Sequence, residues 1–591
     1  MILSAILIST AIAYLPVWRG EFLGDEYLLI LNNPQVRHPE RMRNFFREQF
    51  WPGKPKDIYY RPLVMISYAL NWKLGKADPL GYHLFNLALH LASVLLFYLL
   101  FRKWFPDQAL LAAALFALHP VLTEAVSKIS GRTDLLAGFF ILLSWLLWSA
   151  AEGKPGAGRI VIYITIALSS LLAMFSKEIG LLLPFLFLAG DWRKSPDKRD
   201  LLRNLRRSLW GYLLVVLSAV IYFWLRSRAL AGIGLEVSDP FLAGFPAWQK
   251  PLLVSRILLE YLRLQFFPIL LGPDYFYTHK FGPGIYPLGP CILAALFWSA
   301  ALLLLIWNLF RRKALALPAI LWLTALLPVA HIVPIPPALA ERFLYLPSVF
   351  YALAFSLFLC HPAKPYPRTI RILTGILIAG FFFLTFFNSR SYQTRQLYYR
   401  SSIKKVPEEK VFHNLLGLDD LEHKFYRRAE KQLLWALALD PNYPETLVNL
   451  GIVKYKLGDR KSEEELYQRA IQASPDYAAA HYNLGVALLS RGQMEPAQAE
   501  LEKASRLDPL NPAAFYWLAR IALLRNEINN AKALLDSGIK IADWYLPALK
   551  LRIRMALEEK DFEKARELIQ KAEKFAPNDP ELNRFRAGLS R

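Results

Sequence analysis

The chain has 591 residues, of which 55% are hydrophobic and 14% aromatic, and its formal net charge is +22. Its two cysteines, Cys291 and Cys360, are too few for a disulfide framework or a cysteine-bound metal, which excludes a disulfide-stabilised secreted domain. The basic charge does not indicate nucleic-acid binding, because much of it lies in short loops between apolar segments, where it fixes membrane topology and meets anionic lipid.

The part from residue 1 to residue 390 contains about a dozen apolar segments. Several runs lack charges and, with their flanks, approach the roughly 20 residues that span a bilayer. Four such runs are residues 109–117, 135–150, 160–175 and 292–306. The first apolar run opens at Met1 without a basic segment before it, which favours a membrane span over a cleaved signal peptide.

Lysine and arginine gather in four short connections, which the positive-inside rule places in the cytoplasm. These are residues 102–103, 193–207, 311–313 and 364–371. A full crossing at residues 251–271 would put 311–313 on the opposite side, and Arg256, Glu260 and Arg263 share one helix face there. We therefore predict an interfacial or re-entrant helix at 251–271 and about eleven true spans, with the amino terminus inside and the chain after residue 390 outside.

The first outer loop, residues 19–62, begins with the acidic pair Asp25-Glu26. Carboxylates directly after a span are costly unless they have a cationic partner or a function. One carboxylate of such a pair can take the proton of an acceptor hydroxyl while its neighbour holds position. A helix N-cap or a solvated loop acid is the alternative interpretation.

Beyond residue 390 the chain becomes polar and repeats with a period of 34 residues. The period is marked by prolines and by small residues at fixed distances after them. These positions are Pro407, Pro441, Pro475 and Pro509, with Gly417, Gly451, Gly485 and Ala519, and Ala429, Ala497, Ala531 and Ala565. This pattern resembles tetratricopeptide repeats, which have two antiparallel helices in each unit.

Two repeats depart from the pattern, because Ser462 and Glu463 stand where alanine is expected and Asp543 replaces a proline. We predict a linker at 391–406, followed at 407–591 by a right-handed superhelix of about five repeats and a capping helix. Stacked repeats leave a concave groove that commonly binds extended peptide.

Short polar motifs follow one another along the membrane part. In chain order they are Tyr60-Arg61-Pro62-Leu63, Gly81-Tyr82-His83-Leu84-Phe85-Asn86, His119-Pro120-Val121, Gly131-Arg132-Thr133-Asp134, Ser176-Lys177-Glu178, Gly272-Pro273-Asp274-Tyr275 and Glu341-Arg342-Phe343-Leu344-Tyr345. With the acidic pair, this series resembles the GT-C glycosyltransferases that use polyprenyl-phosphate sugars, and in particular the transmembrane and tetratricopeptide-repeat O-mannosyltransferases. That family often has two aspartates where this chain has Asp25-Glu26.

The resemblance implies an all-α fold and an inverting transfer of a hexose, with mannose as the candidate, from a polyprenyl phosphate to a protein or glycan hydroxyl. The repeat groove would present the acceptor. No cofactor or divalent metal is expected. Because the chain contains no Asn-X-Ser/Thr sequon, we favour a bacterial plasma membrane with the repeats outside the cytoplasm, and an endoplasmic reticulum membrane with lumenal repeats is the alternative.

The resemblance also assigns site residues. Asp25 would be the general base with Glu26 as its partner, and Arg342 is the preferred phosphate ligand because a guanidinium can clamp two oxygens. The further phosphate-binding candidates are Lys177, Arg132, Arg226 and Arg228, and the supporting candidates are Glu124, Asp134, Glu178, Glu341, Tyr345 and His119. Each further cation could equally snorkel or pair with a nearby acid, and a buried histidine often satisfies a neighbouring helix.

Two other functions remain open at this point. A membrane-anchored repeat scaffold would need only one span for its anchor. A transporter of lipid-linked glycans would place charges in the middle of spans and duplicate the bundle, whereas the candidates here gather towards one membrane face.

Overall fold

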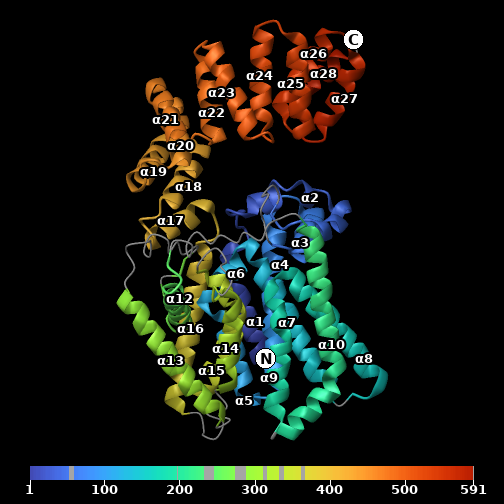
Figure 1. Cartoon of the computed structure of the whole chain (residues 1–591), viewed down its shortest axis with the longest axis vertical. Coiled ribbons are helices and arrows are strands. Elements are labelled where there is room, and N and C mark those ends of the chain that lie inside the picture. Colours follow the sequence, from blue (N-terminus) through green and yellow to red (C-terminus); the bar gives the residue numbers. More distant parts are fainter. Residues whose placement is uncertain are drawn as a thin grey trace. The chain divides into compact units, whose positions relative to one another are not determined.

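The computed structural model describes residues 1–51, 59–152, 154–195, 198–231, 245–269, 271–272, 288–310, 316–331, 339–360 and 367–589 (Figure 1). Over these residues every regular element is a helix, which confirms the all-α prediction. The chain divides into two compact units, Met1–Pro407 and Glu408–Arg591. We call them the membrane unit and the repeat unit.

Within its described residues, the membrane unit has seven helices that are long and apolar enough to cross a membrane. They are α4 (Pro79–Phe101), α7 (Arg132–Ala151) with residues 129–131, α8 (Gly156–Ser176), α10 (Lys198–Ala229), α13 (Leu288–Phe310), α15 (Tyr345–Leu359) with residues 341–344, and α16 (Arg368–Arg390). An eighth results if α5 (Pro106–Leu118) and the residues up to Ser127, which bend by 47° against it, form one span. Because α1 (Ile2–Ala13) and α14 (Ala316–Leu326) are shorter, the predicted count of eleven is not confirmed.

Shorter elements connect these helices. They are η1 (Leu15–Val17), η2 (Tyr27–Leu31), α2 (Pro34–Arg37), η3 (Pro39–Arg47), α3 (Pro62–Gly75), η4 (Pro120–Leu122), α6 (Thr123–Ser127), η5 (Ile129–Gly131), η6 (Glu178–Leu182), α9 (Leu183–Lys194), α12 (Lys250–Phe266), η7 (Leu327–Val329), η8 (Glu341–Leu344) and α17 (Arg395–Lys405). The segment expected to be interfacial or re-entrant forms α12, which is not among the apolar helices. Residues 273–275 and 311–313 lie outside the described residues.

The start of α4 is set by local sequence. Pro79 takes the first helical position, where its missing N–H costs nothing. The Asp78 carboxylate caps the helix by accepting a hydrogen bond from the Leu80 N–H at 3.0 Å. The polar motif 81–86 therefore lies in the first two turns of the helix, at the end that begins after α3.

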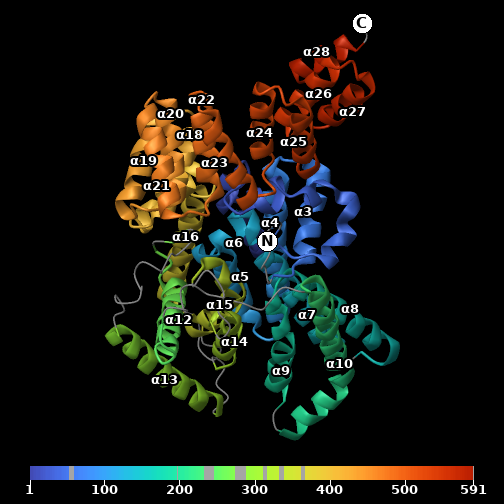
Figure 2. The same cartoon turned by 45° about the horizontal axis from the view of Figure 1, so that its top comes forward.

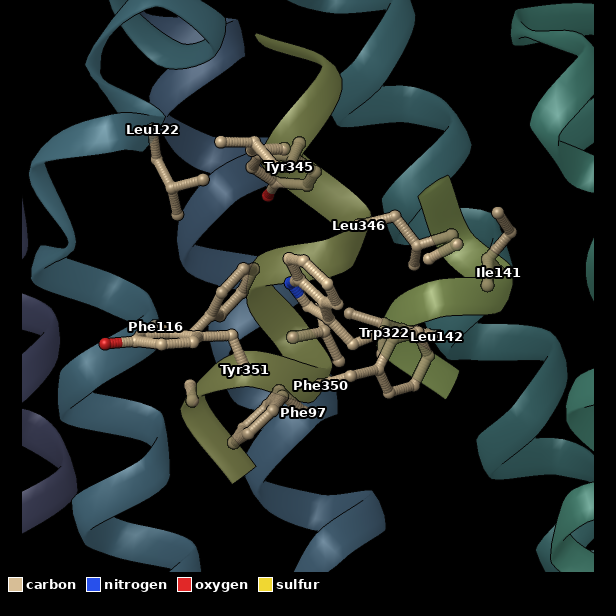
Figure 3. Close-up of a cluster of buried hydrophobic side chains, with 14 of the residues drawn as sticks. Phe97, Phe116, Leu122, Ile141, Leu142, Trp322, Tyr345, Leu346, Phe350 and Tyr351 are labelled. Carbon is tan, nitrogen blue, oxygen red and sulfur yellow. The ribbon is translucent and has the colours of Figure 1, made fainter. Parts of the chain in front are cut away.

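An aromatic core holds α4, α5, α7 and α15 together (Figure 3). Phe97 of α4 stacks on Phe116 of α5 with ring centroids 5.5 Å apart. Gly138 of α7 permits a close crossing with α15, because a Cβ at this position would lie 2.6 Å from the Tyr345 ring. Close packing of this kind fixes the ends of the helices, where the polar motifs lie.

The repeat unit consists of five helix pairs and a final helix, and the pairs follow one another in Figures 1 and 2. The pairs are α18 (Lys410–Glu422) with α19 (Tyr426–Leu439), α20 (Pro444–Lys456) with α21 (Arg460–Ala473), α22 (Ala478–Ser490) with α23 (Met494–Leu507), α24 (Pro512–Leu524) with α25 (Ile528–Ile541), and α26 (Leu546–Glu558) with α27 (Phe562–Glu573); α28 (Pro580–Gly588) ends the series. The first helices of successive pairs begin 34 residues apart, so each pair corresponds to one period of the sequence.

Glycine marks the closest crossing in three successive pairs. A Cβ at Gly417 or at Gly485 would lie 2.7 Å from the Cγ of Leu433 or Leu501 in the second helix of the pair. The second pair is tighter, since a Cβ at Gly451 would lie 2.4 Å from the Tyr467 ring. The 34-residue spacing of these glycines therefore reflects a repeated steric requirement.

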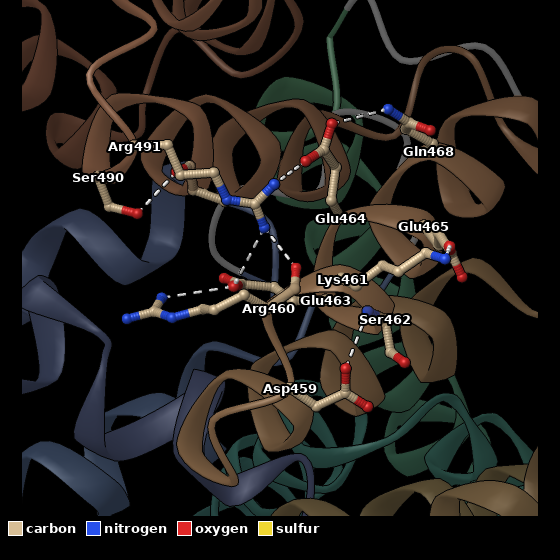
Figure 4. A network of polar contacts seen from close by, with 11 residues as sticks. Asp459, Arg460, Lys461, Ser462, Glu463, Glu464, Glu465, Gln468, Ser490 and Arg491 are labelled. Carbon is tan, nitrogen blue, oxygen red and sulfur yellow. Dashed lines mark hydrogen bonds and ion pairs between the residues drawn. The ribbon is translucent and has the colours of Figure 1, made fainter.

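Glu463 occupies the alanine position of the second repeat and is held by an ion-pair network (Figure 4). Its side chain is 5% exposed and lies 3.4 Å from Arg460 and 3.9 Å from Arg491. Burial raises the pKa of Glu463, and both arginines lower it. Because the folded state favours the protonated carboxyl, its stabilising contribution is present at acidic pH and is lost as the pH rises.

Glu463→Ala restores the residue of the other repeats. We predict that at neutral pH its free energy of unfolding equals that of the native repeat unit or exceeds it by about 1 kcal/mol. The reason is that alanine removes the cost of burying a carboxylate. Thermal unfolding followed by circular dichroism checks this. The exposed Glu465 gives a matched control, Glu465→Ala, and a clear drop in the midpoint of Glu463→Ala alone would contradict the prediction.

Candidate active site

Asp25 and Glu26 are neighbours in very different environments. Glu26 is 1% exposed, and its carboxylate accepts hydrogen bonds from the N–H groups of Leu23 at 2.7 Å and Ser130 at 3.0 Å. Asp25 is exposed, and its carboxylate has no hydrogen bond or ion pair with the described residues. Glu26 thus fastens the first loop to η5, while Asp25 is available to a ligand.

Burial raises the pKa of Glu26 to about 7. The N–H groups of Leu23 and Ser130 and the charge of Lys128 oppose this shift. The folded loop therefore favours a protonated Glu26, and this contribution to stability is lost as the pH rises through about 7. Such a group is better suited to support the loop than to act as an ionised base.

Lys177 and Asp134 form an ion pair between the end of α8 and the first turn of α7. The Lys177 Nζ lies 2.6 Å from the Asp134 carboxylate and 4.6 Å from the centre of the Phe343 ring. The two side chains are only 11% and 6% exposed, so water screens the pair weakly. Burial lowers the pKa of Lys177, and Asp134 raises it.

Arg342 is held by Glu124, which is fully buried at the start of α6. One Glu124 oxygen accepts a hydrogen bond from the Arg342 backbone N–H at 3.0 Å, and the other pairs with the Arg342 guanidinium. The Arg342 side chain is 20% exposed. One face of the guanidinium is therefore fixed by the acid, and part of the group still reaches the surface.

Arg61 is a third cation of this region, and sequence reasoning did not single it out. Its guanidinium lies 3.4 Å from the Glu178 carboxylate and 4.5 Å and 5.3 Å from the centres of the Tyr59 and Phe50 rings. The only feature of the sequence that could have indicated a role for Arg61 was its place in the motif Tyr60-Arg61-Pro62-Leu63 at the start of α3.

Arg61 and Arg342 both lie within electrostatic reach of Lys177, because each lowers its pKa. Burial raises the pKa of Tyr68, whose phenol is within electrostatic reach of Asp25 and of Arg61. The structure therefore gathers three cations from segments far apart in the sequence, and the exposed Asp25 carboxylate shares the neighbour Tyr68 with one of them.

Arg132 is placed differently from the sequence prediction. It is fully buried, and its guanidinium donates to Asn86 at 2.9 Å, Asn71 at 2.6 Å and the Tyr82 carbonyl at 2.9 Å. A phosphate has no access to a group enclosed in this way. We assign Arg132 the structural role of joining α7 to α3 and α4.

Arg226 and Arg228 lie in the last turn of α10. Tyr222, one turn before Arg226, contacts Tyr60 with ring centroids 6.0 Å apart, so this end of α10 borders the segment that carries Arg61. Arg228 is exposed, and its guanidinium lies 5.0 Å from the centre of the Trp224 ring. Their role as phosphate ligands stays a prediction.

Three supporting candidates have structural partners. The Glu341 carboxylate accepts a hydrogen bond from the Gly272 N–H at 2.6 Å. The Tyr345 hydroxyl lies 3.0 Å from His90 Nδ1. His119 uses both ring nitrogens, since Nε2 lies 2.9 Å from the Gln265 carbonyl and Nδ1 accepts from Val121 N–H at 3.2 Å. This arrangement defines a neutral His119 with no nitrogen left for proton transfer.

Residues 391–406, the predicted linker, contain α17, which belongs to the membrane unit. The helix contacts the loops of the candidate site. The Arg395 N–H donates to the Glu21 carboxylate at 3.1 Å, and the Lys128 Nζ lies 5.7 Å from the centre of the Tyr398 ring. Burial lowers the pKa of Lys405, and the negative charge of Glu341 opposes this shift, so the end of α17 is within electrostatic reach of η8.

The described residues thus define a multi-helix membrane protein with a helical repeat unit and a charged cluster at one end of its bundle. Two family models described as tetratricopeptide repeat match residues 414–478 and 464–521. This confirms the nature of the repeats.

Over a larger part of the chain, similarity is to protein O-mannosyltransferases, as the motifs predicted. Protein O-mannosyl-transferase F38B6.6 of Caenorhabditis elegans is 27% identical over 462 residues, which are 74% of this chain and 63% of that protein. Human protein O-mannosyl-transferase TMTC3 is 25% identical over 497 residues, 77% of this chain and 53% of that protein. The chain therefore spans less than two thirds of the length of either relative.

Among solved structures, the one titled "Functional Characterization of Pseudomonas Aeruginosa pilF" is 21% identical. It covers 33% of this chain and 88% of its own, with a TM-score of 0.29.

We predict that Glu26→Ala destabilises the membrane unit by about 1–3 kcal/mol, because two buried N–H groups lose their acceptor. The loss should be greater at about pH 5 than at about pH 9, since Glu26 contributes most when it is protonated. Thermal unfolding in detergent measures both effects. Asp25→Asn is the matched control, and equal midpoints for the two variants would contradict the different roles of these neighbours.

Proposed function

We propose that the chain is an inverting GT-C glycosyltransferase. It transfers a hexose, with mannose as the candidate, from a polyprenyl phosphate to a hydroxyl of a protein or glycan. The observation that carries the proposal is the exposed carboxylate of Asp25, which is unpaired among the described residues, in the same unit as three cations that are each held by an acid, Arg61, Lys177 and Arg342. Similarity to named O-mannosyltransferases supports the reaction class.

The geometry suits a displacement at the anomeric carbon. Asp25 takes the proton of the acceptor hydroxyl, whose oxygen forms a bond to C1 of the sugar on the face opposite the phosphate. The bond between C1 and the phosphate oxygen breaks, and the electron pair leaves with the lipid phosphate. Inversion follows because attack and departure occur on opposite faces.

The leaving phosphate gains negative charge as this bond breaks. Cations that are already held in place stabilise such charge without reorganising during the reaction. Each of the three cations here is fixed by its own acid: Arg61 by Glu178, Lys177 by Asp134 and Arg342 by Glu124. Of these, Arg342 retains the clearest exposure and is the first choice for a phosphate ligand.

The proposal places this end of the bundle on the outer side of a plasma membrane, with the repeat unit on the same side. The repeat groove would hold the acceptor and raise its concentration at the site. An anchored scaffold and a lipid-linked glycan transporter are the competing functions, and the following experiment separates them from the transferase.

We expect Asp25→Asn to lower sugar transfer by about 10²–10⁴-fold, because the variant loses its general base. The assay uses purified protein in liposomes with radiolabelled hexose polyprenyl phosphates and an envelope extract as the acceptor source. Glu40→Gln, an exposed acid of the same loop, is the control. Equal transfer by Asp25→Asn and the native chain would reject the assigned base, and absence of transfer with every donor would favour a scaffold or transporter.

Truncation after Pro407 should remove acceptor presentation but leave the chemistry. The cut keeps α17, because this helix belongs to the membrane unit. Transfer to the natural acceptor should fall about 10²-fold, and transfer to a small hydroxyl acceptor at high concentration should change little. Unchanged transfer to the natural acceptor would show that the repeats have another role.

A further inference from the structure

A second basic site lies away from the ion pairs described above. A cavity of 590 Å³ opens where η1 and the two residues after it meet the end of α16, within the size range of about 300–1,000 Å³ typical of ligand sites. Its wall includes Leu15, Trp18, Arg19, Phe386 and Arg390. None of these residues belongs to the candidate active site.

The donors around this cavity have no acceptor among the described residues. Arg19 and Arg390 are exposed, and neither guanidinium has a hydrogen bond or ion pair there. The Trp18 indole N–H is buried and lacks an acceptor in the same part of the chain. Glu21, the acid nearest in sequence, is instead engaged by Arg395. Two positive charges and a buried donor without a matching acid favour an anionic ligand.

The surroundings of the cavity indicate that this anion is attached to a lipid. On α1, Ile8 and Ile12 are 61% and 46% exposed, and on α16, Phe383 and Phe387 are 57% and 61% exposed. In each helix the two residues are one turn apart and share a face. Since α16 is a candidate span whose most apolar part is only 17% buried by the protein, we infer that hydrocarbon covers these faces.

We propose that the cavity between η1 and α16 binds a lipid phosphate monoester, with the phosphate between Arg19 and Arg390 and the lipid chain along the exposed faces of α1 and α16. A monoester carries a charge of about −1.5 to −2 at neutral pH, which matches two guanidinium groups better than the single charge of a phosphodiester lipid. The planar guanidinium fork also fits phosphate oxygens. The site is separate from the reaction centre and does not depend on the proposed transfer.

Binding by the full-length protein in nanodiscs tests the proposal. The probes are phosphatidic acid and a prenyl phosphate as monoesters and phosphatidylglycerol as a diester, each titrated against the native chain by native mass spectrometry. The variants are Arg19→Gln, Arg390→Gln and the double variant. Arg43→Gln is the matched control, because Arg43 is an exposed arginine of the first loop that does not line the cavity.

We expect the native chain to bind a monoester at least about 10-fold more tightly than the diester, and the double variant to lose this preference. Arg43→Gln should keep it. The monoester that competes better identifies the source, a membrane phospholipid or a released prenyl carrier. Equal binding of monoester and diester, or an undiminished preference in the double variant with an unchanged melting midpoint, would overturn the proposal. Since no sugar is transferred in this assay, the result is independent of Asp25.

Discussion

Pairing of buried charge is the constraint on which the end of the membrane unit that carries the polar motifs depends. Glu124 and Arg342 are 218 residues apart in sequence, and the acid is fully buried. An unpaired carboxylate in that place would cost several kcal/mol, so the fold brings η8 to α6 and keeps it there. The same requirement positions Lys177 beside Asp134. Arg342 and Lys177 are therefore held in fixed positions by buried acids, which is the preorganisation that the proposed electrostatic catalysis would require.

Sequence periodicity predicted the repeat unit almost completely, whereas hydropathy predicted the membrane unit only in outline. The 34-residue period is a steric property of each helix pair, so it locates Gly417, Gly451 and Gly485 at crossings without any knowledge of the rest. Hydropathy measures composition and does not report where a helix bends or stops. The bend after α5 coincides with Pro120, which has no N–H to continue the helix. Helix α14 stops after only 11 residues.

The candidate site shows the same division. The prominence of Asp25-Glu26 could be read from the chain, because adjacent acids after an apolar run are unusual. Their separation into an exposed and a buried carboxylate could not, since it depends on Ser130 of a distant turn. The sequence suggested Arg132 as a phosphate ligand, because it does not show which residues surround the guanidinium. In the structure its partners, Asn71 and Tyr82, come from other helices. Long-range contacts decide whether a cation faces a substrate or the interior.

The placement of α17 has a mechanical consequence. This helix is bonded to the first loop through Glu21 and packs against Lys128 near η5, and the repeat unit begins directly after it. Disordered chain in this place would leave the first loop unsupported on the side of residue 21. The docked helix instead holds that side, since Glu21 is bonded to α17 while Glu26 is bonded to η5. The loop that carries Asp25 is therefore fastened at both of its flanks, which limits how far this carboxylate can move.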